Sequence, residues 1–244
     1  MDDDRLGPGS TFGGRPVLEN SAHVRVKASA TVLIVRPASA VVSTVEPIGP
    51  RRPSALEVLL LRRNDRSGFV AGVHLYPGGA VDESDAHIPT SGADHPESLA
   101  ELEAIDRIAI AAAARECFEE AGILLAHGPD GEWATDEHVR MLRAEEPFSD
   151  ALRRLELTVP LHRFAPWGRW VTPIGAPRRY DTRFFIVEAP PDAVIRVDGR
   201  EIVHGAWWDP AAALAAEREG EVRFVTPTRK TLERLACDGW QPRR

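Results

Sequence analysis

Three carboxylates at the end of one predicted helix are the residues of this chain best placed to do chemistry. From Ser98 to Ala121 the sequence has no Gly or Pro and is rich in good helix formers, and Gly122 then provides a common helix stop. Glu116, Glu119 and Glu120 fall at i, i+3 and i+4, so they share one face of that helix. A separate apolar stripe is predicted to be buried: Ile110, Ala114, Cys117 and Ala121.

This acidic cluster has two interpretations. Like charges at helical spacing repel each other, and the last turn also carries the negative end of the helix dipole. A solvated acidic face is the simpler interpretation. The alternative is a site for a hard divalent cation, because Mg²⁺ prefers oxygen ligands and offsets the repulsion between them. Arg115 is the only cation beside the cluster in the sequence, and the helix alone does not decide between the two.

A glycine pair upstream favours the metal site. Pro77-Gly78-Gly79 follows a strongly apolar run, Leu56 to Leu61. With this pair, the stretch Arg115 to Ile123 resembles the signature of the Nudix hydrolases, which reads G, five residues, E, seven residues, then R-E-U-x-E-E-x-G-U with U aliphatic. Cys117 stands at the first U as a small apolar residue.

The resemblance implies a ligand set and catalytic roles. Mg²⁺ or Mn²⁺ would be held by the three glutamates and the backbone carbonyl of Gly79, and Arg115 would orient the carboxylates. The catalytic residues it implies are Glu119, Glu116 and Arg115. Glu119 is the expected proton acceptor, and the alternatives are Asp181 and Glu201.

The signature is interrupted in this chain. Between Gly79 and Arg115 lie more than twenty residues beyond the family spacing, so the box spans 77–123 with a predicted loop at about 83–97. The interruption leaves the position of the box's first Glu open, a residue that supports the box's Arg in the family. Counting forward from Gly79 gives Asp85, whereas counting back from Arg115 gives Arg107, with Asp106 beside it.

A second stretch of the sequence indicates a subgroup of the Nudix hydrolases. Trp170 to Pro173 and Pro177 to Phe185, together with the insertion, resemble the Nudix group that includes mammalian peroxisomal coenzyme A diphosphatases. Strand alternation puts Asp181 and Arg183 on one face, which would bind phosphate if it lies beside the metal site; otherwise this is a core strand with Arg183 outside. The upstream coenzyme A motif matches only in part, because Ser67 and Gly68 occupy its Leu-Arg places. The predicted substrate-binding residues are Arg62, Arg63, Arg66, Gly78, Arg179, Asp181 and Arg183.

The rest of the chain predicts an α/β fold. Strands are expected at 24–35, 55–62, 169–172, 179–187 and 201–208, and helices at 136–143, 149–155, 210–220 and from 226 onward. This mixed order fits the α/β/α sandwich with a mixed sheet that the resemblance implies, with an insertion between the Gly-Gly loop and the catalytic helix. Residues 1–20 are rich in Asp, Gly and Pro and are expected to be a mobile tail, and 21–244 are expected to form a single domain.

Composition limits the partners. The net charge of −7 argues against nonspecific nucleic-acid binding, and the short apolar segments predict no membrane span. Two cysteines are too few for a disulfide framework, which favours a reducing compartment, the cytoplasm. A homodimer is left open.

These features predict a hydrolase that acts on a small-molecule diphosphate. By resemblance, it is expected to cleave the pyrophosphate linkage of coenzyme A or acyl-coenzyme A. Two alternatives remain: an inactive Nudix fold that binds a ligand, and a pyrophosphatase for NADH, an NDP-sugar or ADP-ribose.

Overall fold

A mixed sheet forms the centre of the protein. The structure, a computed structural model, describes residues 11–12, 15–16, 24–38, 56–66, 71–92, 104–142 and 146–241. The strand order is β11-β4-β3-β10-β9, with β5 paired to β4 and β6 paired to β3. Only the β3–β10 pair in this sheet is parallel, which confirms the predicted mixed sheet. The strands are β3 (Val26–Pro37), β4 (Leu56–Arg63), β5 (His74–Leu75), β6 (Gly78–Ala80), β9 (Ala165–Val171), β10 (Arg179–Glu188) and β11 (Ile202–Trp208).

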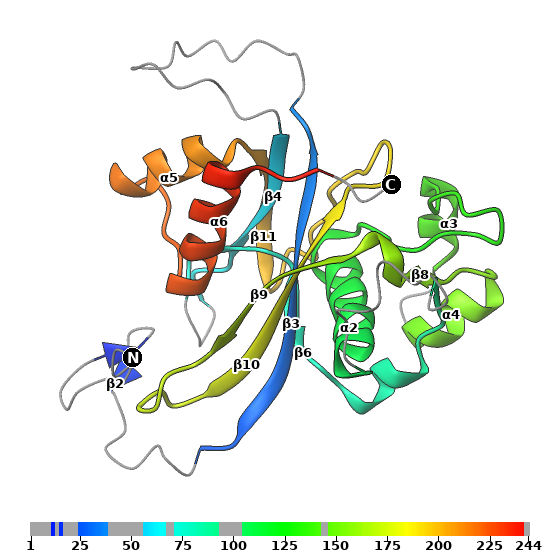
Figure 1. Cartoon of the computed structure of the whole chain (residues 1–244), viewed down its shortest axis with the longest axis horizontal. Coiled ribbons are helices and arrows are strands. Elements are labelled where there is room, and N and C mark those ends of the chain that lie inside the picture. Colours follow the sequence, from blue (N-terminus) through cyan, green and yellow to red (C-terminus); the bar gives the residue numbers. More distant parts are fainter. Residues whose placement is uncertain are drawn as a thin grey trace.

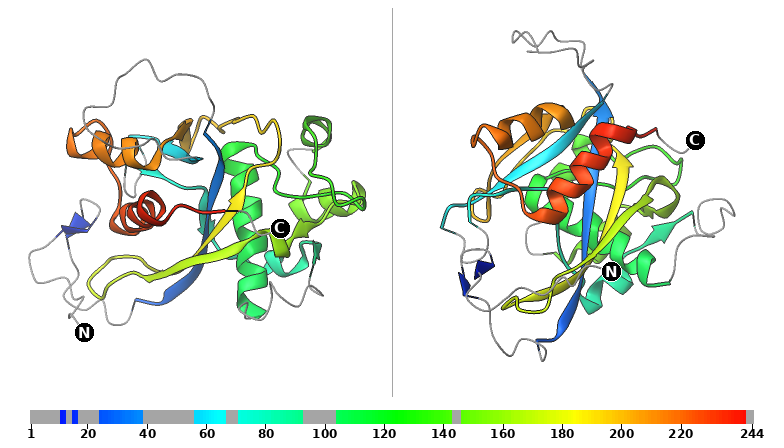
Figure 2. Two further views of the ribbon diagram at one scale, coloured as in Figure 1. Left: turned by 45° about the horizontal axis from the view of Figure 1, so that its top comes forward. Right: turned by 60° about the vertical axis from the view of Figure 1, so that its left-hand side comes forward.

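Helices cover both faces of this sheet (Figures 1 and 2). On β3, Val32 and Ile34 pack toward α2, whereas Leu33 and Val35 pack toward α5 and α6. Burial on both faces explains why the central strands are continuously apolar. The helices are α2 (Ala104–Ala121), α3 (Asp136–Met141), α4 (Phe148–Arg154), α5 (Pro210–Arg218) and α6 (Thr226–Asp238). Two short pairs complete the strands, β1 (Thr11–Phe12) with β2 (Arg15–Pro16) and β7 (Thr90–Ser91) with β8 (Val159–Pro160).

Helix α2 follows the predicted pattern. Ile110, Ala114, Cys117 and Ala121 are all fully buried, as the helical spacing predicts. The helix ends at Gly122, whose φ of +67° is a conformation that glycine adopts at little cost. The predicted start at 98–103 and the predicted tail at 1–20 lie outside the described residues, apart from the two short N-terminal strands.

The insertion was predicted to be a loop, but the part of it that the structure describes contains a short helix. Asp82 caps a short 3₁₀ helix, η2 (Glu83–His87), and the backbone N–H of Asp82 donates to the Asp85 carboxylate at 2.7 Å. Arg153 of α4 donates to the carbonyl of His87. The described insertion therefore lies against α2 and α4. Residues 93–97 are outside the described part.

None of the helices in the described ranges is both long and apolar enough to cross a membrane.

Candidate active site

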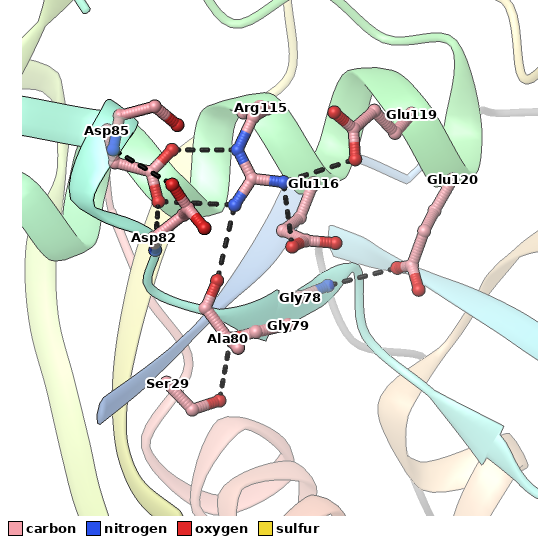
Figure 3. A network of polar contacts seen from close by, with 11 residues as sticks. Ser29, Gly78, Gly79, Ala80, Asp82, Asp85, Arg115, Glu116, Glu119 and Glu120 are labelled. Atoms are coloured by element: carbon pink, nitrogen blue, oxygen red, sulfur yellow. Dashed lines mark hydrogen bonds and ion pairs between the residues drawn. The ribbon is translucent and has the colours of Figure 1, made fainter. Parts of the chain in front are cut away.

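Two of the three helix carboxylates face a cavity. The cavity has a volume of about 560 Å³ and lies where α2 meets the β6 strand. Glu116 and Glu120 project toward β6, whereas Glu119, which does not line the cavity, shares one nitrogen of the Arg115 guanidinium with Glu116 (Figure 3). The lining residues are Ser29, Arg63, Gly78, Gly79, Ala80, Glu116, Glu120, Arg178, Tyr180, Thr182 and Glu201.

The glycine pair lets the strand approach the helix closely. A Cβ at Gly79 would lie 2.5 Å from the Glu116 carboxylate, so any side chain there would displace this carboxylate. The N–H of Gly78 donates to Glu120 Oε2 at 3.0 Å. The hydroxyl of Ser29 donates to the carbonyl of Gly79 at 2.8 Å, which fixes the orientation of that peptide group. The backbone of Gly78 and Gly79 therefore lies directly beside the carboxylates of Glu116 and Glu120.

Burial makes these carboxylates hard to ionise. Glu120 is only 6% exposed, and burial raises its pKa to about 8 despite the hydrogen bond from Gly78. The pKa of Glu116 is also raised by burial, although Arg115 opposes the shift. A solvated acidic face would show neither effect, so the simpler interpretation of the acidic cluster is wrong for Glu116 and Glu120.

Arg115 connects the insertion to the carboxylates. It donates to Asp85 through two nitrogens at 2.7 and 3.2 Å, to Glu116 at 2.8 Å and to Glu119 at 3.1 Å. A fifth hydrogen bond reaches the carbonyl of Ala80 at 3.2 Å. Burial alone would lower the pKa of Arg115, but the hydrogen bond to Asp85 and the neighbouring carboxylates raise it overall. The guanidinium is therefore a fixed, permanently charged centre.

Asp85 supports Arg115 from inside the insertion. Its side chain is fully buried. Counting the family spacing forward from Gly79 predicts this same residue at the position of the box's first Glu. Asp106, beside the residue reached by the backward count, instead pairs with Arg183 at 2.7 Å. The residues beyond the family spacing thus follow Asp85, which stays in contact with the box's Arg.

The upstream arginines separate into one cavity residue and two surface residues. Arg63 lines the cavity and pairs with Glu201 at 2.8 Å. Arg62 pairs with Asp65 at 2.7 Å, and Arg66 is exposed.

Gly78, a predicted substrate residue, lines this cavity, whereas the three predicted substrate residues on β10 do not. Arg179 donates to the carbonyl of Thr172 at 3.0 Å. Asp181 pairs with Arg169 across the β9–β10 hairpin, and this hydrogen bond lowers its pKa. Arg183 lies on the α2 face with Asp106. Asp181 and Arg183 do share a face of β10, but the opposite face lines the cavity.

That opposite face carries residues that the sequence reasoning missed. Tyr180 and Thr182 line the cavity, as does Arg178 just before β10. The alternation of the strand was itself a signal that residues 180 and 182 share a face. Nothing in the sequence around Ser29 marked it as a site residue.

The donor set suits a hard divalent cation. In the ranges that the structure describes, no three His, Cys, Asp or Glu side chains converge on one metal-sized point. Arg115 binds Glu116 and Glu119, and the Gly78 N–H binds Glu120. Glu116, Glu120 and Gly79 nevertheless line the same cavity, and oxygen is the ligand that Mg²⁺ and Mn²⁺ prefer. A cation among them would offset the cost of ionising two buried acids.

Comparison with known proteins identifies the family. The model of the NUDT19 Nudix domain matches residues 95–235, which is more than half of the chain. The chain belongs to the Nudix hydrolase family. Membership places it among hydrolases of pyrophosphate bonds, consistent with the intact Arg115, Glu116, Glu119 and Glu120.

Its relatives in this family include acyl-coenzyme A diphosphatases. The chain is 30% identical to acyl-coenzyme A diphosphatase NUDT19 of Gallus gallus, over 82% of the chain and 68% of the relative. Its identity to the Xenopus laevis protein of the same name is 25%, over 75% of the chain and 60% of the relative. The chain therefore spans between 60 and 68% of the length of these two relatives.

The fold agrees with a solved Nudix structure. A Nudix hydrolase from Alicyclobacillus acidocaldarius superposes with a TM-score of 0.70 at 25% identity, covering 88% of this chain and 92% of the other. The predicted α/β Nudix architecture is thereby confirmed.

Proposed function

We propose that this Nudix hydrolase cleaves the pyrophosphate linkage of coenzyme A or an acyl-coenzyme A with the help of Mg²⁺ or Mn²⁺. The observation that carries the proposal is the pair of carboxylates, the buried Glu120 and the partly buried Glu116, that face a polar cavity at the Gly78-Gly79 strand. Buried acids cost stability, so a pure ligand-binding fold would have no reason to keep them. The names of the relatives support the coenzyme A substrate.

The metal would be held by residues already in place. Glu116 and Glu120 supply carboxylates from the cavity wall, the carbonyl of Gly79 supplies a third donor, and Glu119 supplies a further carboxylate from the exposed side. When bound, the ion neutralises charge on the diphosphate oxygens and activates a water molecule for attack.

The protein's own residues position the substrate and the carboxylates. Arg115 holds Glu116 and Glu119 in fixed orientations, and the buried Asp85 keeps Arg115 from moving. Arg63 places a cation on the cavity wall, where it attracts the diphosphate. Such preorganised positioning and charge account for most of the rate acceleration in phosphoryl transfer.

A proton must leave the attacking water, and we assign its acceptor to Glu119. This carboxylate is half exposed, with 53% of its side chain accessible, so it can pass the proton on to solvent. Glu201 is the alternative, because it lines the cavity and is similarly exposed. Asp181 faces away from the cavity and is bound to Arg169. A Glu119→Gln variant is expected to lower kcat with little change in KM. If kcat is unchanged and Glu201→Gln lowers it instead, the assignment changes to Glu201.

Substrate preference is tested with a panel. Purified protein is incubated with Mg²⁺ or Mn²⁺ and coenzyme A, an acyl-coenzyme A, NADH, ADP-ribose or an NDP-sugar, and kcat/KM is compared between them. The highest value is expected for a coenzyme A derivative. A higher value for ADP-ribose or NADH would refute the substrate assignment, and no turnover of any substrate would favour the ligand-binding alternative.

A further inference from the structure

The cavity has a second cationic position, Arg178, far from the carboxylates. Besides Arg63, Arg178 is the cation that the described part of the chain contributes to the cavity lining. The two arginines come from different elements, since Arg63 ends β4 and Arg178 immediately precedes β10. The cavity therefore offers positive charge at two separate places.

The floor between these places is a row of residues on one face of β10. Thr182 is paired in register with Ser29, whose hydroxyl holds the Gly79 carbonyl, so Thr182 lies next to the metal end of the cavity. Alternation puts Tyr180 and then Arg178 on the same face, each two residues and about 7 Å further along the chain. All three residues line the cavity. Arg178 thus begins about 13 Å from the row of Ser29 and Thr182.

This order matches the order of groups in one class of substrate. With a diphosphate at the carboxylates and Arg63, the ribose would lie over Thr182 and Tyr180. A further phosphate on that ribose would meet the guanidinium of Arg178, and the base would extend to one side of this line. An arginine fork suits a phosphate at that position, because its planar donors bind phosphate oxygens in pairs. A nucleoside diphosphate without a second phosphate would not make this contact with Arg178.

We propose that Arg178 is a specificity-determining residue that binds the 3′-phosphate of a 3′-phosphorylated adenosine diphosphate moiety. The inference rests on the proposed function for its substrate class. It adds a reason why this cavity would distinguish coenzyme A from NADH, ADP-ribose and NDP-sugars, which carry no 3′-phosphate. Arg178 contributes binding to a group remote from the reacting phosphorus, so its loss is expected to affect recognition of one substrate class more than the chemical step.

Equilibrium binding tests the inference without turnover. Adenosine 3′,5′-bisphosphate and AMP are titrated in the presence of Mn²⁺ into the wild type and the Arg178→Gln and Arg178→Lys variants. The wild type is expected to bind the bisphosphate about ten- to hundredfold more tightly than AMP, or about 1.4–2.7 kcal/mol. Arg178→Gln is expected to remove that preference by weakening the bisphosphate alone, and Arg178→Lys to restore part of it. The matched control is Arg169→Gln, on the same hairpin and 60% exposed, which is expected to keep the full preference.

Two results would overturn the inference. A wild type without preference for the bisphosphate would show that no 3′-phosphate site exists. Equal weakening of both ligands in Arg178→Gln would show that the arginine binds the 5′-phosphate they share. The two proposals can fail separately. A protein that prefers the bisphosphate over AMP but does not hydrolyse coenzyme A has the 3′-phosphate site and lacks the proposed activity.

Discussion

Replacing Glu120 by Gln is expected to stabilise the metal-free protein at neutral and alkaline pH. Glu120 is buried, and its carboxylate accepts one backbone hydrogen bond, from Gly78. Burial raises its pKa from an ordinary value of 4.5 to about 8. Below pH 4.5 the group is protonated in both the folded and the unfolded state. Between pH 4.5 and 8 the unfolded chain releases the proton while the folded protein retains it, so the free energy of unfolding falls as pH rises.

The pKa difference sets the size of this effect. At about 1.4 kcal/mol per pH unit, the interval from 4.5 to about 8 corresponds to roughly 5 kcal/mol, an upper limit reached above pH 8. Glutamine keeps the acceptor oxygen for the Gly78 N–H and cannot ionise, so the variant avoids the loss. For a chain of this size each kcal/mol shifts Tm by about 2–4 °C.

Urea and thermal unfolding of both proteins at pH 5, 7 and 9 in EDTA measures the effect. The two stability curves are expected to converge near pH 5 and to separate progressively at higher pH, with the variant more stable. Addition of Mn²⁺ is expected to stabilise the wild type more than the variant. The control is Glu119→Gln, which removes a half-exposed carboxylate and should leave the pH dependence close to that of the wild type. Parallel curves for wild type and Glu120→Gln would refute the conclusion that this carboxylate is buried at a cost.

Two other substitutions test the construction of the site. Asp85→Ala removes the two hydrogen bonds that hold Arg115, so kcat is expected to fall about 10- to 100-fold with a smaller change in KM. Asp85→Glu is expected to recover part of the activity. An unchanged kcat in Asp85→Ala would show that this aspartate does not position the arginine. Gly79→Ala places a methyl group 2.5 Å from the Glu116 carboxylate, so metal-dependent activity should fall below one-hundredth of wild type while circular dichroism still reports a folded protein; near-normal activity would contradict the close approach.

The sequence predicted the elements because their periodicities are clear. The helical spacing of Ile110, Ala114, Cys117 and Ala121 identified the buried side of the catalytic helix, and all four are buried. The strands at 24–35, 55–62 and 179–187 were each predicted within a few residues of their observed bounds. The packing requirement that produces these patterns is local enough to be visible in a single sequence.

The insertion made Asp85, the acid that supports Arg115, difficult to identify from the sequence. An acid three residues after Asp82 is a capping-box pattern, which was the available signal that a short helix carries Asp85. Counting could not choose between Asp85 and Asp106, because the answer depends on whether the extra residues come before or after the acid. The contact between Asp85 and Arg115 settles the order.

The face of β10 that lines the cavity could not be predicted from the sequence for a different reason. Helices cover both faces of the sheet, so neither face is marked by exposed polar residues alone. The paired charges of Asp181 and Arg183 drew attention to one face, yet each has an ion-pair partner elsewhere. The cavity lies over the face of Tyr180 and Thr182, where the short β6 strand adds to β3.

We propose that Glu116 and Glu120 serve the hydrolysis of the pyrophosphate linkage in coenzyme A or an acyl-coenzyme A. The direct measurement is mass-spectrometric analysis of the products from an acyl-coenzyme A, with Mn²⁺ or with EDTA, for the wild type and Glu120→Gln. Adenosine 3′,5′-bisphosphate and an acyl-phosphopantetheine are expected only from the wild type with Mn²⁺. The same products from Glu120→Gln at the wild-type rate, or from the wild type in EDTA, would contradict the claim.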